Sequence, residues 1–216
     1  MKIKLAKAAV LCGVIFTAIT IAACSKQSDK PVTTATPSSS RPASALEPVT
    51  SQLPDSWASG SAAGVTWRIP GDWEIGAPAP MRAGTYLAGA AEGDDEGAEC
   101  RVNYFGQGQG GEVQQNIDRW QSQMEISGQE GVFADPLVSR VKVNGLNVSM
   151  VELSGTYLSK SRPMALQFTR KVDFKMFAAI VQAPGGMLFF KMTGPAKTME
   201  LQRQGFRQIV GSLSVL

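Results

Sequence analysis

The second half of the chain contains several short apolar-rich runs separated by turn residues, the pattern that predicts β-strands and hairpins. Its clearest part is a pair of apolar-rich runs, 137–143 and 146–154, which the dipeptide Asn144-Gly145 joins. Both central residues of a two-residue type I′ turn need positive φ, and Asn-Gly accepts this readily. The pattern therefore predicts a β-hairpin with a tight turn at Asn144-Gly145.

A second hairpin is predicted further along the chain, where the Pro-Gly-Gly sequence at 184–186 separates the runs 174–183 and 187–193. These runs are apolar on both faces, which is typical of central strands that are covered from either side. Between the two hairpins, residues 157–163 are polar and predict an excursion from the sheet.

Shorter extended segments precede the hairpins. Alternation predicts them at 64–70, 73–75, 81–87 and 100–105. The first two are separated by a Pro-Gly-Asp turn at 70–72. Acidic residues at 92–96 lack the alternating oxygen ligands and central glycine of an EF-hand loop, so we expect a solvated hairpin tip there instead of a calcium site.

Two other segments carry the apolar spacing of helices. In 112–124, four apolar residues recur at i, i+4, i+7 and i+11, which gives a helix with one apolar stripe. They are Val113, Ile117, Trp120 and Met124.

The last helix is predicted to begin after Gly194-Pro195, because a helix accepts proline in its first turn. Apolar residues mark its buried side: Met199, Phe206, Ile209, Val210 and Leu213. Short early strands, one helix, two hairpins and a terminal helix together predict an α+β domain, with a mostly antiparallel sheet flanked by helices.

The first 23 residues have the pattern of a secretory signal peptide. Three lysines lie within the first seven positions, and the run 8–23 is uncharged. That run is short for a membrane span and ends in small residues. Residues 21–24 (Ile-Ala-Ala-Cys) resemble the bacterial lipobox. The resemblance implies cleavage before Cys24, a diacylglyceryl thioether on its sulfur and acylation of its new amine, with palmitate as the expected acyl group.

Composition divides the chain into three parts: a signal peptide at 1–23, a lipidated tether at 24–52 and a single globular α+β domain at 53–216. The tether is polar and contains several prolines, so we expect it to be disordered. Attached acyl chains would hold the protein stably in the bacterial cell envelope. Ser25 stands where Asp would resemble the inner-membrane retention signal, which favours the periplasmic face of the outer membrane.

Charge and histidine content exclude several classes of function. Removal of residues 1–23 would leave 18 basic and 18 acidic side chains, and a neutral chain has no electrostatic footprint for nucleic acid. The chain contains no histidine, which excludes Ser-His-Asp and Cys-His catalysis and histidine-bearing zinc sites. We therefore expect a non-catalytic protein without a cofactor or a metal.

Cys100 is the only thiol left once the signal peptide is removed and Cys24 is lipidated. The alternation in 98–104 places Cys100 on the apolar face of a strand, together with Val102. Because free cysteine is among the most buried residue types, we expect a structural role for Cys100.

A glycine-rich stretch at 106–111 formally matches G-x-G-x-x-G between a strand and a helix. Its surroundings predict antiparallel strands, so we expect a structural loop and not a dinucleotide site. The following helix N-terminus could still receive an anionic group of a partner. Polar residues beside the loop are the candidate partner-binding residues: Arg82, Gln109 and Arg119.

The favoured hypothesis is a binding or scaffolding module for another envelope protein, and two alternatives stay open. One is an enzyme that acts on an envelope polymer through two carboxylates facing each other in a cleft. Its candidates are Glu92, Asp94 and Glu112. The other is a carrier of an apolar ligand in a groove between the sheet and the terminal helix, which exposed side chains at 189, 190 or 192 would support.

Several strings are similar to those of a family of uncharacterised bacterial envelope proteins, many of them lipoproteins. The most distinctive are Tyr-Phe-Gly-x-Gly-Gln-Gly-Gly at 104–111 and Phe-Phe-Lys-x-Thr-Gly-Pro at 189–195. Shorter ones lie at 67–73, 81–82, 116–120 and 184–186. The family implies no activity. The order of elements is also similar to the PsbP-like α/β/α sandwich, whose known members mostly bind other proteins, although a fold alone does not define a function.

Overall fold

The computed structural model describes residues 58–160 and 167–216. The predicted signal peptide and tether lie outside these residues, as do 53–57 at the start of the predicted domain. The elements, in chain order, are β1 (Ser59–Ala62), β2 (Val65–Arg68), β3 (Glu74–Ile75), β4 (Arg82–Ala88), β5 (Ala98–Tyr104), α1 (Val113–Gln121), β6 (Met124–Glu125), β7 (Leu137–Val143), β8 (Leu146–Ser159), β9 (Thr169–Ala183), β10 (Gly186–Pro195), α2 (Ala196–Leu201), α3 (Arg203–Gly211) and β11 (Ser214–Val215).

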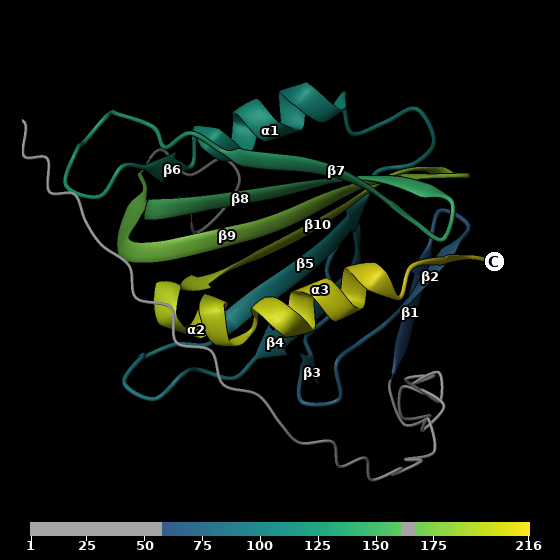
Figure 1. Cartoon of the computed structure of the whole chain (residues 1–216), viewed down its shortest axis with the longest axis horizontal. Helices are drawn as coiled ribbons and strands as arrows, with labels where there is room; N and C mark the ends of the chain where they lie inside the picture. Colours follow the sequence, from purple (N-terminus) through teal and green to yellow (C-terminus); the bar gives the residue numbers. More distant parts are fainter. Residues whose placement is uncertain (1–57, 161–166) are drawn as a thin grey trace, which may run out of the picture. The chain divides into compact units, whose positions relative to one another are not determined.

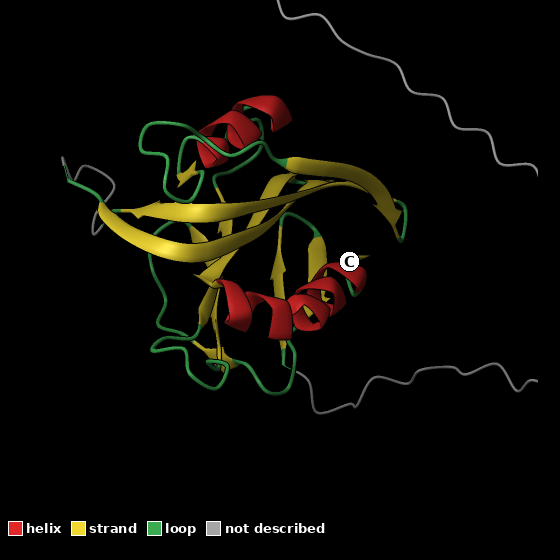
Figure 2. Ribbon diagram, turned by 60° about the vertical axis from the view of Figure 1, so that its left-hand side comes forward, coloured by secondary structure: helices red, strands yellow, loops and turns green. Residues whose placement is uncertain are grey.

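An eight-stranded antiparallel sheet organises the domain (Figure 1). Its order is β3-β4-β5-β10-β9-β8-β6. Strand β7 pairs with the same edge of β8 as β6 does, but with the first half of β8, whereas β6 pairs near its end. A smaller sheet has the order β1-β2-β11. Helices lie on both sides of the large sheet (Figure 2). The predicted α+β fold, a mostly antiparallel sheet flanked by helices, is confirmed.

The larger core lies between the big sheet, α2, α3 and the small sheet. Trp67 of β2 is fully buried in it, with its ring edge-on to Phe190 of β10 at 5.2 Å between centroids. Its indole Nε1 donates a hydrogen bond of 2.8 Å to the Tyr86 hydroxyl on β4. Cys100 is completely buried in the same core, so the prediction that it lies on the apolar face of its strand is confirmed.

The second core lies on the other face of the sheet, under α1. Ile117 and Trp120 of α1 pack there against Phe189 of β10 and apolar residues of β8 and β9. Residues 189 and 190 point to opposite cores, which confirms that β10 is a central strand covered on both faces. Because α1 has only nine residues, it covers only part of this face.

Both predicted hairpins are present, but β8 and β9 are longer than expected. The turn is confirmed at Asn144 and Gly145, with φ of 45° and 87°. β8 continues to Ser159, so the predicted polar excursion is wrong for 157–159, and residues 161–166 lie outside the described ones. Tyr157 stacks on Phe174 of β9 at 6.2 Å, and such cross-strand aromatic contacts extend the pairing of the two strands.

The predicted terminal helix is wrong in one respect, because two short helices take its place. They meet at Gln202, which is buried and accepts a hydrogen bond of 2.9 Å from the Trp73 indole. The break between α2 and α3 therefore lies at a tertiary contact, in which Trp73 holds the side chain of Gln202. Helix α1 similarly ends at Gln121, and Met124, predicted as its last apolar residue, is buried from strand β6.

The four early strands predicted by alternation are present as β2 to β5. Strands β1, β6 and β11 were not predicted. The sequence of β1, Ser-Gly-Ser-Ala, has no large apolar residue, and the two-residue strands β6 and β11 lie at the ends of segments predicted as helices. Among the described residues, no helix is both long enough and apolar enough to cross a bilayer.

Candidate functional site

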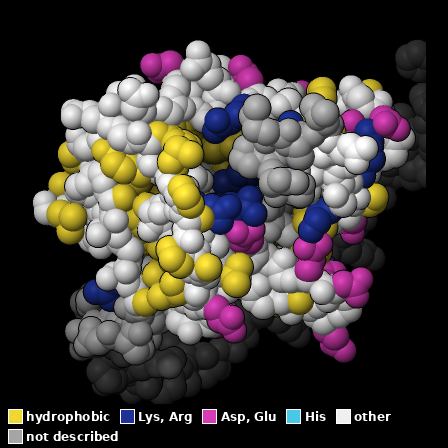
Figure 3. Space-filling model, turned by 180° about the vertical axis from the view of Figure 1, so that it is seen from behind, with side chains coloured by type: hydrophobic (Ala, Val, Ile, Leu, Met, Phe, Trp, Pro, Cys, Tyr) yellow, Lys and Arg dark blue, Asp and Glu magenta, His cyan; other side chains and the backbone are white. Residues whose placement is uncertain are grey.

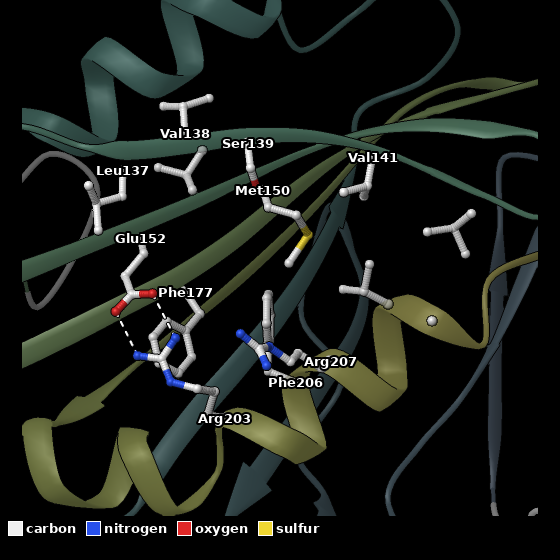
Figure 4. A pocket seen from close by; sticks show the side chains of 14 residues that line it. Leu137, Val138, Ser139, Val141, Met150, Glu152, Phe177, Arg203, Phe206 and Arg207 are labelled. Carbon is white, nitrogen blue, oxygen red and sulfur yellow. Dashed lines mark hydrogen bonds and ion pairs between the residues drawn. The ribbon is translucent and has the colours of Figure 1, made fainter. Parts of the chain in front are cut away.

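An open groove of about 480 Å³ lies between α3 and the β7 side of the sheet (Figure 4). Helix α3 forms one wall with Phe206, Arg207 and Val210. Strand β7 forms the other wall, and Met150 of β8 and Phe177 of β9 lie in the floor. Helices α2 and α3 therefore leave the β7 end of this sheet face uncovered.

The apolar side chains of β7 are exposed in this groove. Leu137 is 72% exposed and Val141 is 43% exposed, although both are large aliphatic residues on a regular strand. Ser139 lies between them on the same face of the strand, and Figure 4 shows all three beside the groove, across from the α3 side chains. Large apolar side chains that together face solvent are typical of a surface that receives a partner or ligand.

A bidentate ion pair closes one end of the groove. Arg203 of α3 donates hydrogen bonds of 2.7 Å to both carboxylate oxygens of Glu152 on β8, which hold the pKa of Glu152 below its usual range. The Arg203 guanidinium also lies 4.5 Å from the centre of the Phe177 ring. Arg207, one turn along α3, is exposed and makes no ion pair within the described part of the chain. The groove thus combines apolar walls with one accessible positive charge.

Strand β7 is also an edge strand. In the described part of the chain it pairs only with β8, over seven residue pairs from Leu137–Glu152 to Val143–Leu146. The backbone groups on its outer side are therefore open to another strand.

A second polar site, on the opposite face of the sheet, contains two of the three predicted partner-binding residues. We call it the basic hollow and define it by Arg82, Arg101, Arg119 and Lys191 around Glu99. Arg82 Nη1 lies 3.4 Å from Glu99 Oε1, and Arg101 also pairs with Glu99. Figure 3 shows Lys and Arg side chains gathered in a recess of this face, beside an acidic group.

Lys191 and Arg119 complete the basic hollow. Lys191 stands directly opposite Arg101 on paired strands, and its Nζ donates to Gln123 Oε1 and, at 3.3 Å, to the Tyr157 hydroxyl. Burial, aided by the charges of Arg101 and Arg119, lowers the pKa of Lys191 to about 7. Arg119 donates a 2.6 Å hydrogen bond to Asn116 Oδ1, and burial lowers its pKa as well.

The third predicted residue, Gln109, is exposed in the glycine loop and lines a shallow site of about 380 Å³ with Gln182 and Met187. The loop has a packing role, because a Cβ at Gly110 would lie 2.7 Å from the Phe189 ring. Asn116 of α1 also donates a 2.9 Å hydrogen bond to the Gly110 carbonyl. These contacts account for the glycine at 110 in structural terms.

The three carboxylates proposed for an enzyme do not form a facing pair. Asp94 accepts hydrogen bonds from the backbone amide and hydroxyl of Thr198, at 2.9 and 2.6 Å, and so caps the start of α2. Glu92 is exposed in the same loop, whereas Glu112 is exposed at the start of α1, the helix on the other face of the sheet. The expected solvated tip at 92–96 is therefore wrong for Asp94, which is tied to α2.

The residues proposed as markers of an apolar carrier are buried. Phe189, Phe190 and Met192 are 3%, 0% and 0% exposed, so they do not line an open groove. The groove beside the terminal helix exists, but β7 supplies its exposed apolar wall. The sequence identified 137–143 as an apolar-rich strand of a hairpin, and nothing in the sequence indicated that its apolar side chains would stay uncovered.

No protein-family model and no characterised protein sequence matches this chain. Solved structures with a similar fold include cyanobacterial PsbP (CyanoP) from Synechocystis, with 12% identity and a TM-score of 0.47 over 79% of this chain and 99% of that one. Another is LpqN, involved in cell envelope biogenesis of Mycobacterium tuberculosis, with 10% identity and a TM-score of 0.42 over 75% and 86%. A Pseudomonas aeruginosa protein of unknown function has 9% identity and a TM-score of 0.43 over 74% and 97%.

The first of these structures is a PsbP protein, the fold to which the order of elements in this chain was expected to be similar. At these TM-scores, the similarities do not indicate what this chain binds. The resemblance to a family of envelope lipoproteins stays a prediction from the sequence.

Proposed function

We propose that this chain is a lipid-anchored, non-catalytic binding module of the bacterial cell envelope, on the periplasmic face of the outer membrane. The single observation that supports binding is the groove between β7 and α3, with its exposed apolar wall. The anchor is supported by the signal-like sequence 1–23 and by Cys24, both outside the described residues.

The proposed occupant of the groove is an extended apolar segment of another envelope protein. Strand β7 offers an open backbone edge, and a segment that adds to a sheet edge gains main-chain hydrogen bonds along its whole length. Alternate side chains of the added strand would lie beside Leu137 and Val141 and face α3. This combination of an open edge and an apolar groove favours a peptide segment over a compact ligand.

The charges on the groove wall indicate which polar side chain the bound segment should carry. Arg203 is neutralised by Glu152, whereas Arg207 on the same wall is exposed and has no ion pair among the described residues. An acidic side chain in the bound segment would complement Arg207. The preferred segment is therefore a strand of alternating apolar residues that carries at least one Asp or Glu.

A peptide-display selection against the whole mature protein tests this function. We expect selected peptides to show alternating apolar residues with an acidic position, and to protect β7 amides from hydrogen exchange. Val141→Asp should abolish binding, whereas Lys142→Asp, the exposed neighbour on the other face of β7, should leave it intact. Equal loss with both variants, or binding that leaves β7 amides unprotected, would refute the groove as the site.

A fluorescent fatty acid, added in the same assay, distinguishes a groove that binds peptides from a groove that binds an apolar ligand. If the fatty acid binds tightly and displaces the selected peptides, the carrier function replaces the scaffolding one. If peptides bind and the fatty acid does not, the proposed function stands.

The anchor is tested separately in cells. We expect labelled palmitate to be incorporated into the wild-type protein and not into Cys24→Ala, which should move from the membrane fraction to the soluble periplasm. Cys100→Ala is the matched control, because it removes the other cysteine of the mature chain and should leave the label in place.

A further inference from the structure

The basic hollow lies on the sheet face opposite the groove, where α1 leaves strands β4, β5 and β10 partly uncovered. Glu99 and Arg101 are two residues apart on β5 and therefore project from the same face. Lys191 is paired across from Arg101 on β10, and Thr85 is paired across from it on β4. Antiparallel pairing thus gathers these groups in one place.

Positive charge in the basic hollow exceeds negative charge. Among the described residues, the hollow has four basic side chains and one carboxylate, that of Glu99. Arg82 and Arg101 pair with Glu99, and the charges of Arg101 and Arg119 act on Lys191. The remaining contacts are with neutral groups, because Lys191 donates to Gln123 and Tyr157, and Arg119 donates to Asn116. Partly buried charges are normally paired, because an unpaired charge loses favourable interactions with water and gains no opposite charge in their place. An anion in the hollow would supply the missing compensation.

Arg101 carries a second sign of an incomplete site. Its Nε is buried and has no hydrogen-bond partner in the described part of the chain. Buried donors in folded proteins are nearly always satisfied, and a lone exception at a functional site often points to an absent ligand or water.

We propose that the basic hollow binds a phosphate group. The three arginines and Glu99 give a net charge of about +2 before Lys191 is counted, and a phosphate monoester carries about −1.5 to −2 at neutral pH. A carboxylate would leave the hollow positive. The planar guanidinium fork also matches the oxygen spacing of phosphate better than an ammonium does. The phosphate can belong to a lipid headgroup or to a soluble compound, since both present the same oxygens.

The first test uses calorimetry and backbone NMR shifts to measure the binding of inorganic phosphate to the whole mature protein. We expect shifts at Arg101 and Lys191, and about tenfold or greater weakening in Arg101→Gln, because hydrogen bonds to charged groups are the strong ones. Arg119→Gln is a second variant that keeps the test valid if the first misfolds. Lys142→Gln, on the exposed β7 surface, is the control and should bind as wild type.

Two further probes identify the source and the class of the anion. Vesicles of phosphatidic acid in phosphatidylcholine, compared with phosphatidylcholine alone, should be bound in an Arg101-dependent way if the phosphate belongs to a lipid. Binding of inorganic phosphate without vesicle binding assigns a soluble phosphate, and both outcomes support the proposal. Absence of phosphate binding in either form, equal binding of acetate, or unchanged affinity in both arginine variants would overturn it. Because none of the groove variants changes a residue of the basic hollow, the outcome is independent of the proposed function.

Discussion

Arg203 of α3 and Glu152 of β8 are joined by two parallel hydrogen bonds of 2.7 Å, and this pair fixes the helix to the sheet at one end of the groove. Lys175 of β9 lies 4.0 Å from the same carboxylate. Bidentate arginine–carboxylate pairs hold their geometry better than single contacts do. The width of the groove at this end therefore depends on the charge of Glu152.

Acid should weaken this link. Hydrogen bonds from Arg203 lower the folded-state pKa of Glu152 below the unfolded value of about 4.3, so the stabilisation is complete above that pH and is lost as the pH falls through the folded pKa. We expect the free energy of unfolding to drop below about pH 4, and to drop less in Glu152→Gln. Urea titrations across acidic pH measure this. Glu74→Gln, an exposed carboxyl without an ion pair in the described residues, should keep the wild-type profile.

Lys191 should make stability rise with pH in the alkaline range. Burial, with Arg101 and Arg119 nearby, lowers its folded pKa to about 7, whereas a lysine in the unfolded chain titrates near about 10.4. Between these values the unfolded state binds more protons, so the free energy of unfolding increases with pH. Glu99 and Tyr157 also face Lys191, and burial raises the pKa of Tyr157 above its usual value.

Urea unfolding of wild type and Lys191→Met, between about pH 7 and about pH 10, checks this expectation. The slope should be smaller in Lys191→Met, and Lys142→Met should retain it. A wild-type curve that is flat in this range would contradict the lowered pKa. Added phosphate should shift the rise to higher pH if the anion binds beside the ammonium.

The hydrogen bond between Trp67 and Tyr86 predicts a destabilised variant. Tyr86→Phe removes the acceptor of the buried indole Nε1, and a buried donor without a partner costs about 1–3 kcal/mol. Tyr104→Phe is the matched control, because its hydroxyl donates 2.7 Å to the Gly185 carbonyl at a less buried position. We expect a clearly smaller loss for Tyr104→Phe in thermal and urea unfolding. Equal losses of stability in the two variants would contradict the expectation that the buried Trp67 hydrogen bond contributes more than the less buried Tyr104 one.

Cys100 should resist thiol reagents in the native protein. It is completely buried, and burial together with the negative charge of Glu99 raises the pKa of its thiol far above the usual range. We expect iodoacetamide to label Cys100 only in denaturant, at a rate that follows unfolding. Rapid labelling in native buffer would show that the strand β5 opens locally.

Local chemistry determined much of the fold. Asn144-Gly145 specifies its turn because both residues accept positive φ, and the alternation in β5 placed Cys100 in the core before any tertiary contact was known. The apolar runs of β9 and β10 likewise showed that both faces would be covered. These properties depend on residues that are neighbours in sequence, where a period of two or a turn preference leaves a direct pattern.

Tertiary structure decided the sites. Arg82 and Arg119 were chosen from the sequence for their closeness to the glycine loop, but it is strand pairing that brings Arg101 and Lys191 to them, and no sequence spacing indicates such contacts. The loop residue Gln109 does not belong to that cluster. The break at Gln202 is set in the same way, by a hydrogen bond to Trp73 from a distant loop.

The groove between β7 and α3 shows most clearly the difference between what the sequence determines and what the tertiary structure decides. The sequence determined that one face of β7 is apolar, because Leu137 and Val141 follow the strand period. Whether that face is buried depends on how far α2 and α3 extend over the sheet, a matter of helix length and crossing position in three dimensions. Since the helices stop short of β7, a side-chain pattern that predicts a core position becomes an exposed apolar surface, and only the folded chain reveals it.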